Sequence, residues 1–231
     1  MSFQFGTKAA TLKSIAPHLT RARLCEQIAV PAERWRNDQG FMLSEIMGRF
    51  GSVPLAVRSS AACEDGWDSS LAGVHLSHID VKPEAEPLGR AINDVFASYK
   101  TYAESDQVLV QPMVGNVVIS GVVMTRDLDT GGPYYVINYD DVSGRTDTVT
   151  GGAESKSIFV HRSRIEAMKS PRFRHLIDAA IELEGITGSE ALDIEFCIDR
   201  EDEVFILQVR PLAAARQWRR VAAETVDAAI N

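Results

Sequence analysis

The sequence has little cysteine, no long apolar run and no excess of positive charge. Its three cysteines, Cys25, Cys63 and Cys197, lack the Cys-x-x-Cys spacing of a zinc site, and we interpret them as reduced core thiols. No run approaches the roughly 20 apolar residues that cross a bilayer, and the first residues form no signal segment. The net charge of -8 provides no basic field for nucleic acid. We therefore expect a cytoplasmic protein that binds neither a membrane nor nucleic acid.

Enough apolar residues are present for a core. The 231 residues are 45% hydrophobic, which suits one sizeable domain or two lobes that share a cleft. Apolar residues at helical spacing predict helices over residues 8–15, 42–50, 87–102 and 172–184. Apolar runs between turn residues predict strands over residues 53–57, 108–113, 117–125, 134–139, 191–198 and 204–209. We expect the strands between 108 and 139 to form an antiparallel meander, and the last two strands to form a hairpin.

The last predicted hairpin is apolar on one face and polar on the other, because side chains alternate along a strand. The polar face is expected to carry Asp193, Glu195 and Cys197 from its first strand and Val204, Ile206, Gln208 and Arg210 from its second. Carboxylate and amide oxygens suit Mg²⁺, and a guanidinium matches a phosphate. A solvated sheet face with surface ion pairs explains the alternation equally well.

Cations also stand at the ends of other predicted elements. Arg58 leaves the apolar run 53–57 together with the hydroxyls of Ser59 and Ser60, a setting that suits a phosphate. Lys8 follows Thr7, which is placed to cap a helix, and a helix start favours anions. An exposed surface lysine is the alternative for Lys8.

Two further segments are candidates for nucleotide contacts. Thr125 ends the apolar run 117–124, where Gly121 marks either a close approach or a bulge. Gln111-Pro112-Met113 ends another apolar run. Its proline interrupts the hydrogen-bond ladder of the strand, which can leave neighbouring backbone groups free to hydrogen-bond an adenine. An edge-strand proline is an equal alternative.

Taken together and in this order, these segments resemble the ATP-binding domain of the pyruvate phosphate dikinase and phosphoenolpyruvate synthase family. The matching segments are Gly6-Thr-Lys-Ala-Ala-Thr-Leu12, Val57-Arg-Ser-Ser-Ala61, Glu64-Asp65, Ser70-Leu-Ala-Gly73, Val110-Gln-Pro-Met113, Ser120-Gly-Val-Val-Met-Thr125, Asp193-Ile-Glu195 and Leu207-Gln-Val-Arg-Pro211. The resemblance implies an α+β ATP-grasp fold with two lobes, mainly antiparallel sheet flanked by helices. We expect an N-terminal lobe over residues 1–105, a C-terminal lobe over 106–212 and a helical linker or truncated tail over 213–231.

The resemblance also implies a role for each candidate residue toward ATP and Mg²⁺. Phosphate ligands would be Lys8, Arg58 and Arg210, of which the two arginines would be catalytic. Magnesium ligands would be Glu195 and Gln208. Adenine would contact Gln111, Pro112 and Met113, whereas Thr125 and Asp193 would lie near the nucleotide.

Residues 131–147 depart from the glycine-rich loop of the synthases and look more like the capsule-associated branch that includes L-glutamine kinases. Relatives pass the phosphoryl group to a histidine on a separate swivelling domain and then to a third, substrate-binding domain. Here residues 150–155 imitate the carrier motif but are followed by Lys156 instead of histidine. We therefore expect the ATP-binding part of a larger phosphotransferase. The alternatives are a phosphoenolpyruvate synthase-like dikinase domain and a stand-alone nucleotide-binding module without transfer chemistry.

Overall fold

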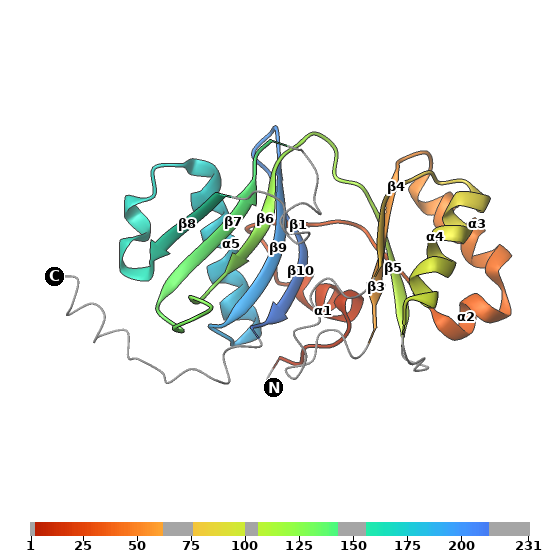
Figure 1. Ribbon diagram of the computed structural model, residues 1–231, viewed down its shortest axis with the longest axis horizontal. Coiled ribbons are helices and arrows are strands. Elements are labelled where there is room, and N and C mark those ends of the chain that lie inside the picture. The colour runs from red at the N-terminus through yellow and green to blue at the C-terminus, as the bar shows by residue number, and fades with distance from the viewer. Residues whose placement is uncertain (1–2, 62–75, 100–105, 143–155, 213–231) are drawn as a thin grey trace. The chain divides into compact units, whose positions relative to one another are not determined.

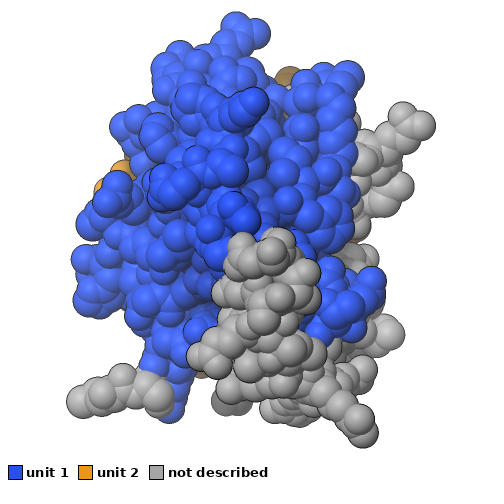
Figure 2. Space-filling view, turned by 90° about the vertical axis from the view of Figure 1, so that its left-hand side faces the viewer, with its two compact units in different colours: residues 1–4, 12–24, 115–231 blue, residues 5–11, 25–114 orange. Residues whose placement is uncertain are grey.

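The computed structural model describes residues 3–61, 76–99, 106–142 and 156–212 (Figure 1). The predictions made on Cys63, Glu64-Asp65, residues 70–73, residues 150–155 and the tail 213–231 lie outside these residues. The chain forms two compact units, coloured separately in Figure 2. Unit 1 comprises residues 1–4, 12–24 and 115–231, and unit 2 comprises residues 5–11 and 25–114.

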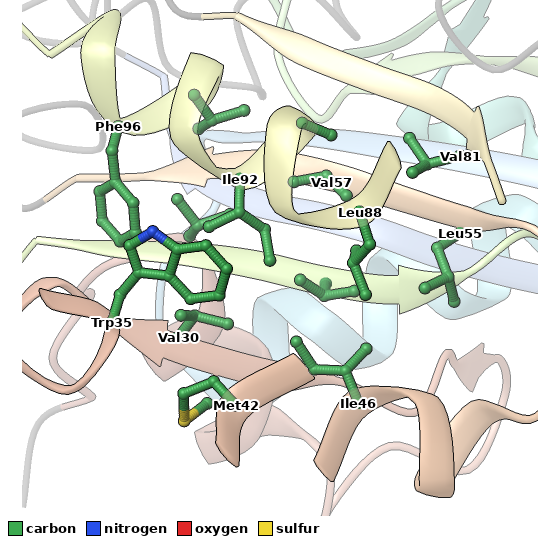
Figure 3. Close-up of a cluster of buried hydrophobic side chains, with 14 of the residues drawn as sticks. Val30, Trp35, Met42, Ile46, Leu55, Val57, Val81, Leu88, Ile92 and Phe96 are labelled. Carbon is green, nitrogen blue, oxygen red and sulfur yellow. The ribbon is translucent and has the colours of Figure 1, made fainter. Parts of the chain in front are cut away.

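Unit 2 is an antiparallel sheet with helices on one face (Figure 1). Its strands follow the order β2 (Ile28–Pro31), β5 (Gln107–Pro112), β3 (Leu55–Ser60) and β4 (Ser77–Val81). The helices are α2 (Ala32–Asn37), α3 (Gln39–Phe50), which Asp38 caps, and α4 (Ala85–Ala97). Figure 3 shows the core between them, where Leu88 and Ile92 of α4 meet Leu55 and Val57 of β3. This packing buries every second residue of β3 and β5 against the helices.

Unit 1 contains a six-stranded sheet in the order β1-β10-β9-β6-β7-β8. The strands are β1 (Arg23–Leu24), β6 (Val117–Met124), β7 (Tyr134–Asp140), β8 (Lys156–His161), β9 (Leu192–Asp199) and β10 (Val204–Pro211). Helix α5 (Pro171–Thr187) packs across one face of this sheet (Figure 1), and the 3₁₀ helix η1 (Arg162–Ala167) follows β8. The opposite face of the sheet carries the polar residues considered below.

Helix α1 (Lys8–Ile15) matches its prediction. The backbone N–H of Ala10 donates to Thr7 Oγ1 at 3.3 Å, so Thr7 caps the helix as expected. Its apolar residues Leu12 and Ile15 are buried.

Several sequence-based predictions need correction. Strand β3 does not end at residue 57 as predicted but continues through Arg58 to Ser60, and its last three residues are buried. The expected meander is wrong for β5, because β5 pairs with β2 and β3 in unit 2, whereas β6 pairs with β7 and β9 in unit 1. The hairpin of β9 and β10 is confirmed.

The compact units also differ from the lobe boundaries expected from the sequence. The change of unit falls between residues 114 and 115 rather than 105 and 106, because β5 completes the sheet of unit 2. Residues 12–24 join unit 1, where β1 pairs in parallel with β10.

The structure also bears on the cysteines and on membrane-spanning helices. Neither Cys25 nor Cys197 forms a disulfide within the described residues. No helix in the described ranges is long and apolar enough to span a membrane.

Candidate functional site

A bulge in β10 determines which of its side chains lie on the polar face of the sheet in unit 1. Pairing with β9 shifts by one residue between Ile206 and Gln208, which leaves Leu207 as the extra residue. Before the bulge, Val204 and Ile206 lie opposite Ile198 and Phe196 and are buried on the apolar face, so their prediction as polar-face residues is wrong. Strict alternation fails here because the bulge reverses it.

Beyond the bulge, the structure brings the predicted polar residues together. Gln208 pairs with Glu195, and Arg210 pairs with Asp193. The four side chains therefore occupy two neighbouring rungs, that is, cross-strand residue pairs, on one face of the sheet. On the other face, Val209 pairs with Ile194 in the core. The amide and carboxylate of one rung thus lie next to the guanidinium and carboxylate of the other.

Asp193 and Arg210 form a closely held ion pair. Both Nε and Nη2 of Arg210 donate to Asp193 Oδ2, at 2.9 and 2.7 Å. The side chains are 16% and 20% exposed. Burial raises the pKa of the Asp193 carboxyl above its usual value, while the Arg210 guanidinium acts in the opposite direction. Asp193 therefore fixes the direction in which Arg210 points.

Glu195 and Gln208 are the residues of this face that fit a divalent cation. No group of three or more His, Cys, Asp and Glu side chains able to hold a metal occurs in the part of the chain that the structure describes. Mg²⁺ does not require such a cage, since it commonly takes one or two protein oxygens and completes its shell with phosphates and water. One carboxylate and one amide oxygen on neighbouring strands fit this pattern.

Thr125 has a different environment from the one expected of a nucleotide ligand. Its side chain is fully buried; Oγ1 donates to the Glu190 carbonyl and accepts from Leu192 N–H, both at 2.8 Å. Backbone groups thus use its donor and one acceptor position. This environment fits a residue that holds the ends of β6 and β9 together just before Asp193, and a direct contact with the nucleotide stays a prediction.

The same face extends past the predicted residues to β7 and β8. The rung of Gln208 and Glu195 continues through Val122 to Asn138 and Ser157. Ser157 Oγ donates to Asn138 Oδ1 at 2.6 Å. The sequence reasoning missed this pair, although alternation within residues 134–139 already separates Asn138 from Ile137.

Unit 2 carries a second set of predicted residues on the sheet face that points away from its helices. Arg58 and Ser60 alternate with the core residue Val57 along β3, and Ala56 pairs with Gln111 of β5. Arg58 is 8% exposed and Gln111 is 2% exposed. The strand rise of about 3.3 Å per residue puts Ser60 roughly 13 Å along β3 from the rung of Gln111.

Lys8 belongs to the same region of unit 2. The N–H of the next residue, Ala9, donates to Ser60 Oγ at 3.1 Å, which fixes the start of α1 at the Ser60 end of β3. Residue Lys8 is 8% exposed, and its side chain has no hydrogen bond or ion pair within the described ranges. An ammonium without such partners is suited to an anion.

The segment Gln111–Met113 offers fewer backbone donors than its proline suggests. The N–H of Met113 donates to the Pro54 carbonyl at 2.8 Å, so it is not left free by Pro112. In contrast, Gln111 Nε2 is buried and has no hydrogen-bond partner among the described residues. A purine at this position would accept a hydrogen bond from the Gln111 side chain rather than from the Met113 backbone N–H.

Known proteins resemble this chain in sequence. The model of the family "Pyruvate phosphate dikinase, AMP/ATP-binding domain" matches residues 40–169, which is more than half of the chain. An uncharacterised phosphotransferase, YvkC of Bacillus subtilis (strain 168), is 24% identical over 214 residues, covering 74% of this chain and 26% of the relative. The prodigiosin synthesizing transferase PigC of Serratia marcescens is 26% identical over 203 residues, covering 68% and 22%. The chain thus spans about a quarter of the length of these relatives.

The fold is also found in solved structures. The D-alanine-D-alanine ligase of Helicobacter pylori superimposes with a TM-score of 0.52 at 15% identity, covering 92% of this chain and 56% of the ligase. This likeness identifies the fold as ATP-grasp, as the sequence predicted. The family match itself shows that the chain belongs to the family of pyruvate phosphate dikinase AMP/ATP-binding domains.

Proposed function

We propose that this domain binds MgATP and delivers its phosphoryl group to a histidine on a separate swivelling domain. The observation that carries the proposal is the pair of adjacent rungs in unit 1, Gln208 with Glu195 and Arg210 with Asp193. These two residue pairs combine two side-chain oxygens that suit Mg²⁺ with a guanidinium that Asp193 orients and that suits a phosphate.

Each unit carries its own candidate ligands, and their roles are proposed for each unit separately. In unit 1, Glu195 and Gln208 would hold Mg²⁺, and Arg210, oriented by Asp193, would bind a phosphate. In unit 2, Lys8 and Arg58 would bind phosphates. The base would lie at Gln111, whose buried Nε2 lacks a partner in the described ranges, so that the phosphate chain runs along β3 toward Ser60.

The chemistry asked of these residues is positioning and charge neutralisation. Phosphoryl transfer needs the phosphates aligned with the acceptor and their negative charge stabilised, with little covalent work by the protein. When bound, Mg²⁺ would neutralise charge on the phosphates. Arg58 and Arg210 would stabilise the charge on the transferred group.

A calorimetric titration of the chain with MgATP tests this proposal. Arg210→Ala removes a charge-assisted contact of about 1.5–3 kcal/mol, so MgATP affinity should fall roughly 10- to 100-fold. Arg172→Ala is the matched control, because Arg172 pairs with Asp202 at the surface of the same unit. A parent chain that does not bind MgATP, or equal losses in both variants, would sink the proposal.

For the final acceptor we propose the amide of L-glutamine, in capsule polysaccharide modification, with pyruvate as the alternative. Glutamine is supported by the resemblance of residues 131–147 to the capsule-associated branch. Pyruvate is supported by the matching family, which is described by pyruvate phosphate dikinase. Phosphorus NMR of the products formed by the complete gene product with each acceptor separates them. A phosphorylated glutamine amide supports the first, and phosphoenolpyruvate supports the second.

A further inference from the structure

Two side chains from outside helix α1 hold the backbone of Ala9, the residue that follows Lys8. Ser60 Oγ accepts the Ala9 N–H at 3.1 Å, and Gln27 Nε2 donates to the Ala9 carbonyl at 2.9 Å. Ala9 is 3% exposed and Ser60 is fully buried. The first turn of α1 is therefore fixed through both polar groups of one peptide residue.

Ser60 is itself held by the core of unit 2. The Tyr99 hydroxyl accepts the Ser60 N–H at 3.0 Å and donates to the Gln107 carbonyl at 2.5 Å. It thereby bridges the last rung between β3 and β5. Because Phe96 packs edge-on against the Tyr99 ring, this bridge is anchored in the hydrophobic core. The position of Ser60 Oγ is thus set by packing and not by the loop that follows β3.

This arrangement connects Lys8 with Arg58. Ser60 and Arg58 are two residues apart on β3 and share the sheet face that points away from the helices. Holding Ala9 at Ser60 keeps the start of α1, and with it Lys8, at that same face. The side chain of a lysine is long and flexible, so any additional freedom of its backbone makes the position of the ammonium less well defined.

We propose that Ser60 and Gln27 are positioning residues for the phosphoryl-transfer reaction, acting through Lys8. They touch neither nucleotide nor metal in this account. They fix the backbone from which Lys8 reaches a phosphate, and this role rests on the proposed function of Lys8 as a phosphate ligand. The alternative is that both hydrogen bonds contribute to folding stability alone.

A double-mutant cycle of Ser60→Ala and Lys8→Ala distinguishes the two roles. In the otherwise unchanged chain, Ser60→Ala removes one hydrogen bond and should weaken MgATP binding about fivefold. In the Lys8→Ala background the same change should leave the affinity unaltered, since there is no ammonium left to place. Calorimetry of the four proteins measures both steps.

Gln27→Met provides a second variant in case Ser60→Ala does not fold. Gln27 Oε1 is buried without a hydrogen-bond partner among the described residues, so replacing the amide also removes an unsatisfied acceptor. We expect an unchanged midpoint of thermal unfolding and, again, a loss of MgATP affinity that disappears in the Lys8→Ala background.

Ser98→Ala is the matched control for a lost serine hydroxyl bond in unit 2, because Ser98 Oγ donates to the Val95 carbonyl at 2.7 Å, away from α1. It should leave MgATP affinity unchanged. Equal losses for Ser60→Ala with and without Lys8, or for Ser98→Ala, would overturn the positioning role while leaving ATP binding intact. A parent chain that fails to bind MgATP would instead overturn the proposed function itself.

Discussion

Replacement of Thr125 by valine separates a structural residue from a nucleotide ligand. The change keeps the shape of the side chain and removes its hydroxyl, which is fully buried between the Glu190 carbonyl and Leu192 N–H. Two neutral hydrogen bonds contribute about 1 kcal/mol each, and an unsatisfied buried Leu192 N–H costs about 1–3 kcal/mol. Since Arg162 Nη2 also lies 3.4 Å from the Glu190 carbonyl, we expect a total loss near the lower end of this sum, about 3–4 kcal/mol.

Urea unfolding followed by circular dichroism measures this loss. Thr187→Val is the matched control in the same unit, because Thr187 Oγ1 donates to the Leu183 carbonyl within α5 and accepts the Ser189 N–H only at 3.4 Å. Its loss should cost less than that of Thr125, about 1 kcal/mol. MgATP affinity of folded Thr125→Val should stay within about threefold of the parent, well under the roughly 10-fold loss expected for a phosphate ligand. Unchanged stability together with a tenfold loss of affinity would refute the reasoning.

The remaining predictions concern packing and pH. Gly121→Ala should destabilise the chain by about 3 kcal/mol or more, because an added Cβ would lie 2.1 Å from the Asn138 carbonyl oxygen of the neighbouring strand. The control is Gly185→Ala in α5, whose added Cβ meets nothing within 4 Å and should stabilise the chain by about 0.5–1 kcal/mol. Equal stabilities of the two variants in urea unfolding would contradict this prediction. The pKa of Glu182 is lowered, because bonds from Thr20 and from the Arg21 N–H outweigh the effect of burial. Its contribution to stability should therefore be present above its ordinary value of 4.5 and disappear as pH falls through the lower folded value. Amide exchange of Thr20 and Arg21 should accelerate over that window in the parent, and Glu182→Gln should remove the pH dependence.

Local features of the chain were predictable from the sequence. Thr7 caps α1 because capping depends on a few neighbouring residues, and alternation placed Asp193 and Glu195 correctly on one face of β9. Gln208 and Arg210 were also placed correctly, although the bulge at Leu207 reverses the pattern for Val204 and Ile206. Nothing in an alternating sequence marks the residue at which a bulge is inserted.

Pairings between distant segments could not be predicted in this way. Strand β5 joins β2 and β3 rather than the following β6, and this choice depends on which core accepts Val108 and Val110. The contact between Ser60 and Ala9 joins residues 51 positions apart. The buried, unpartnered Nε2 of Gln111 likewise becomes visible only when the sheet is assembled.

The dependence of ATP binding on Mg²⁺ tests the central claim most directly. Calorimetric titration of ATP into the chain, with Mg²⁺ and then with EDTA, compares the parent with the double variant Glu195→Ala, Gln208→Ala. We expect Mg²⁺ to strengthen binding to the parent about tenfold or more, which corresponds to about 1.4 kcal/mol, and to have little effect on the double variant. An equal effect of Mg²⁺ on both proteins, or no binding of ATP to the parent, would contradict the account.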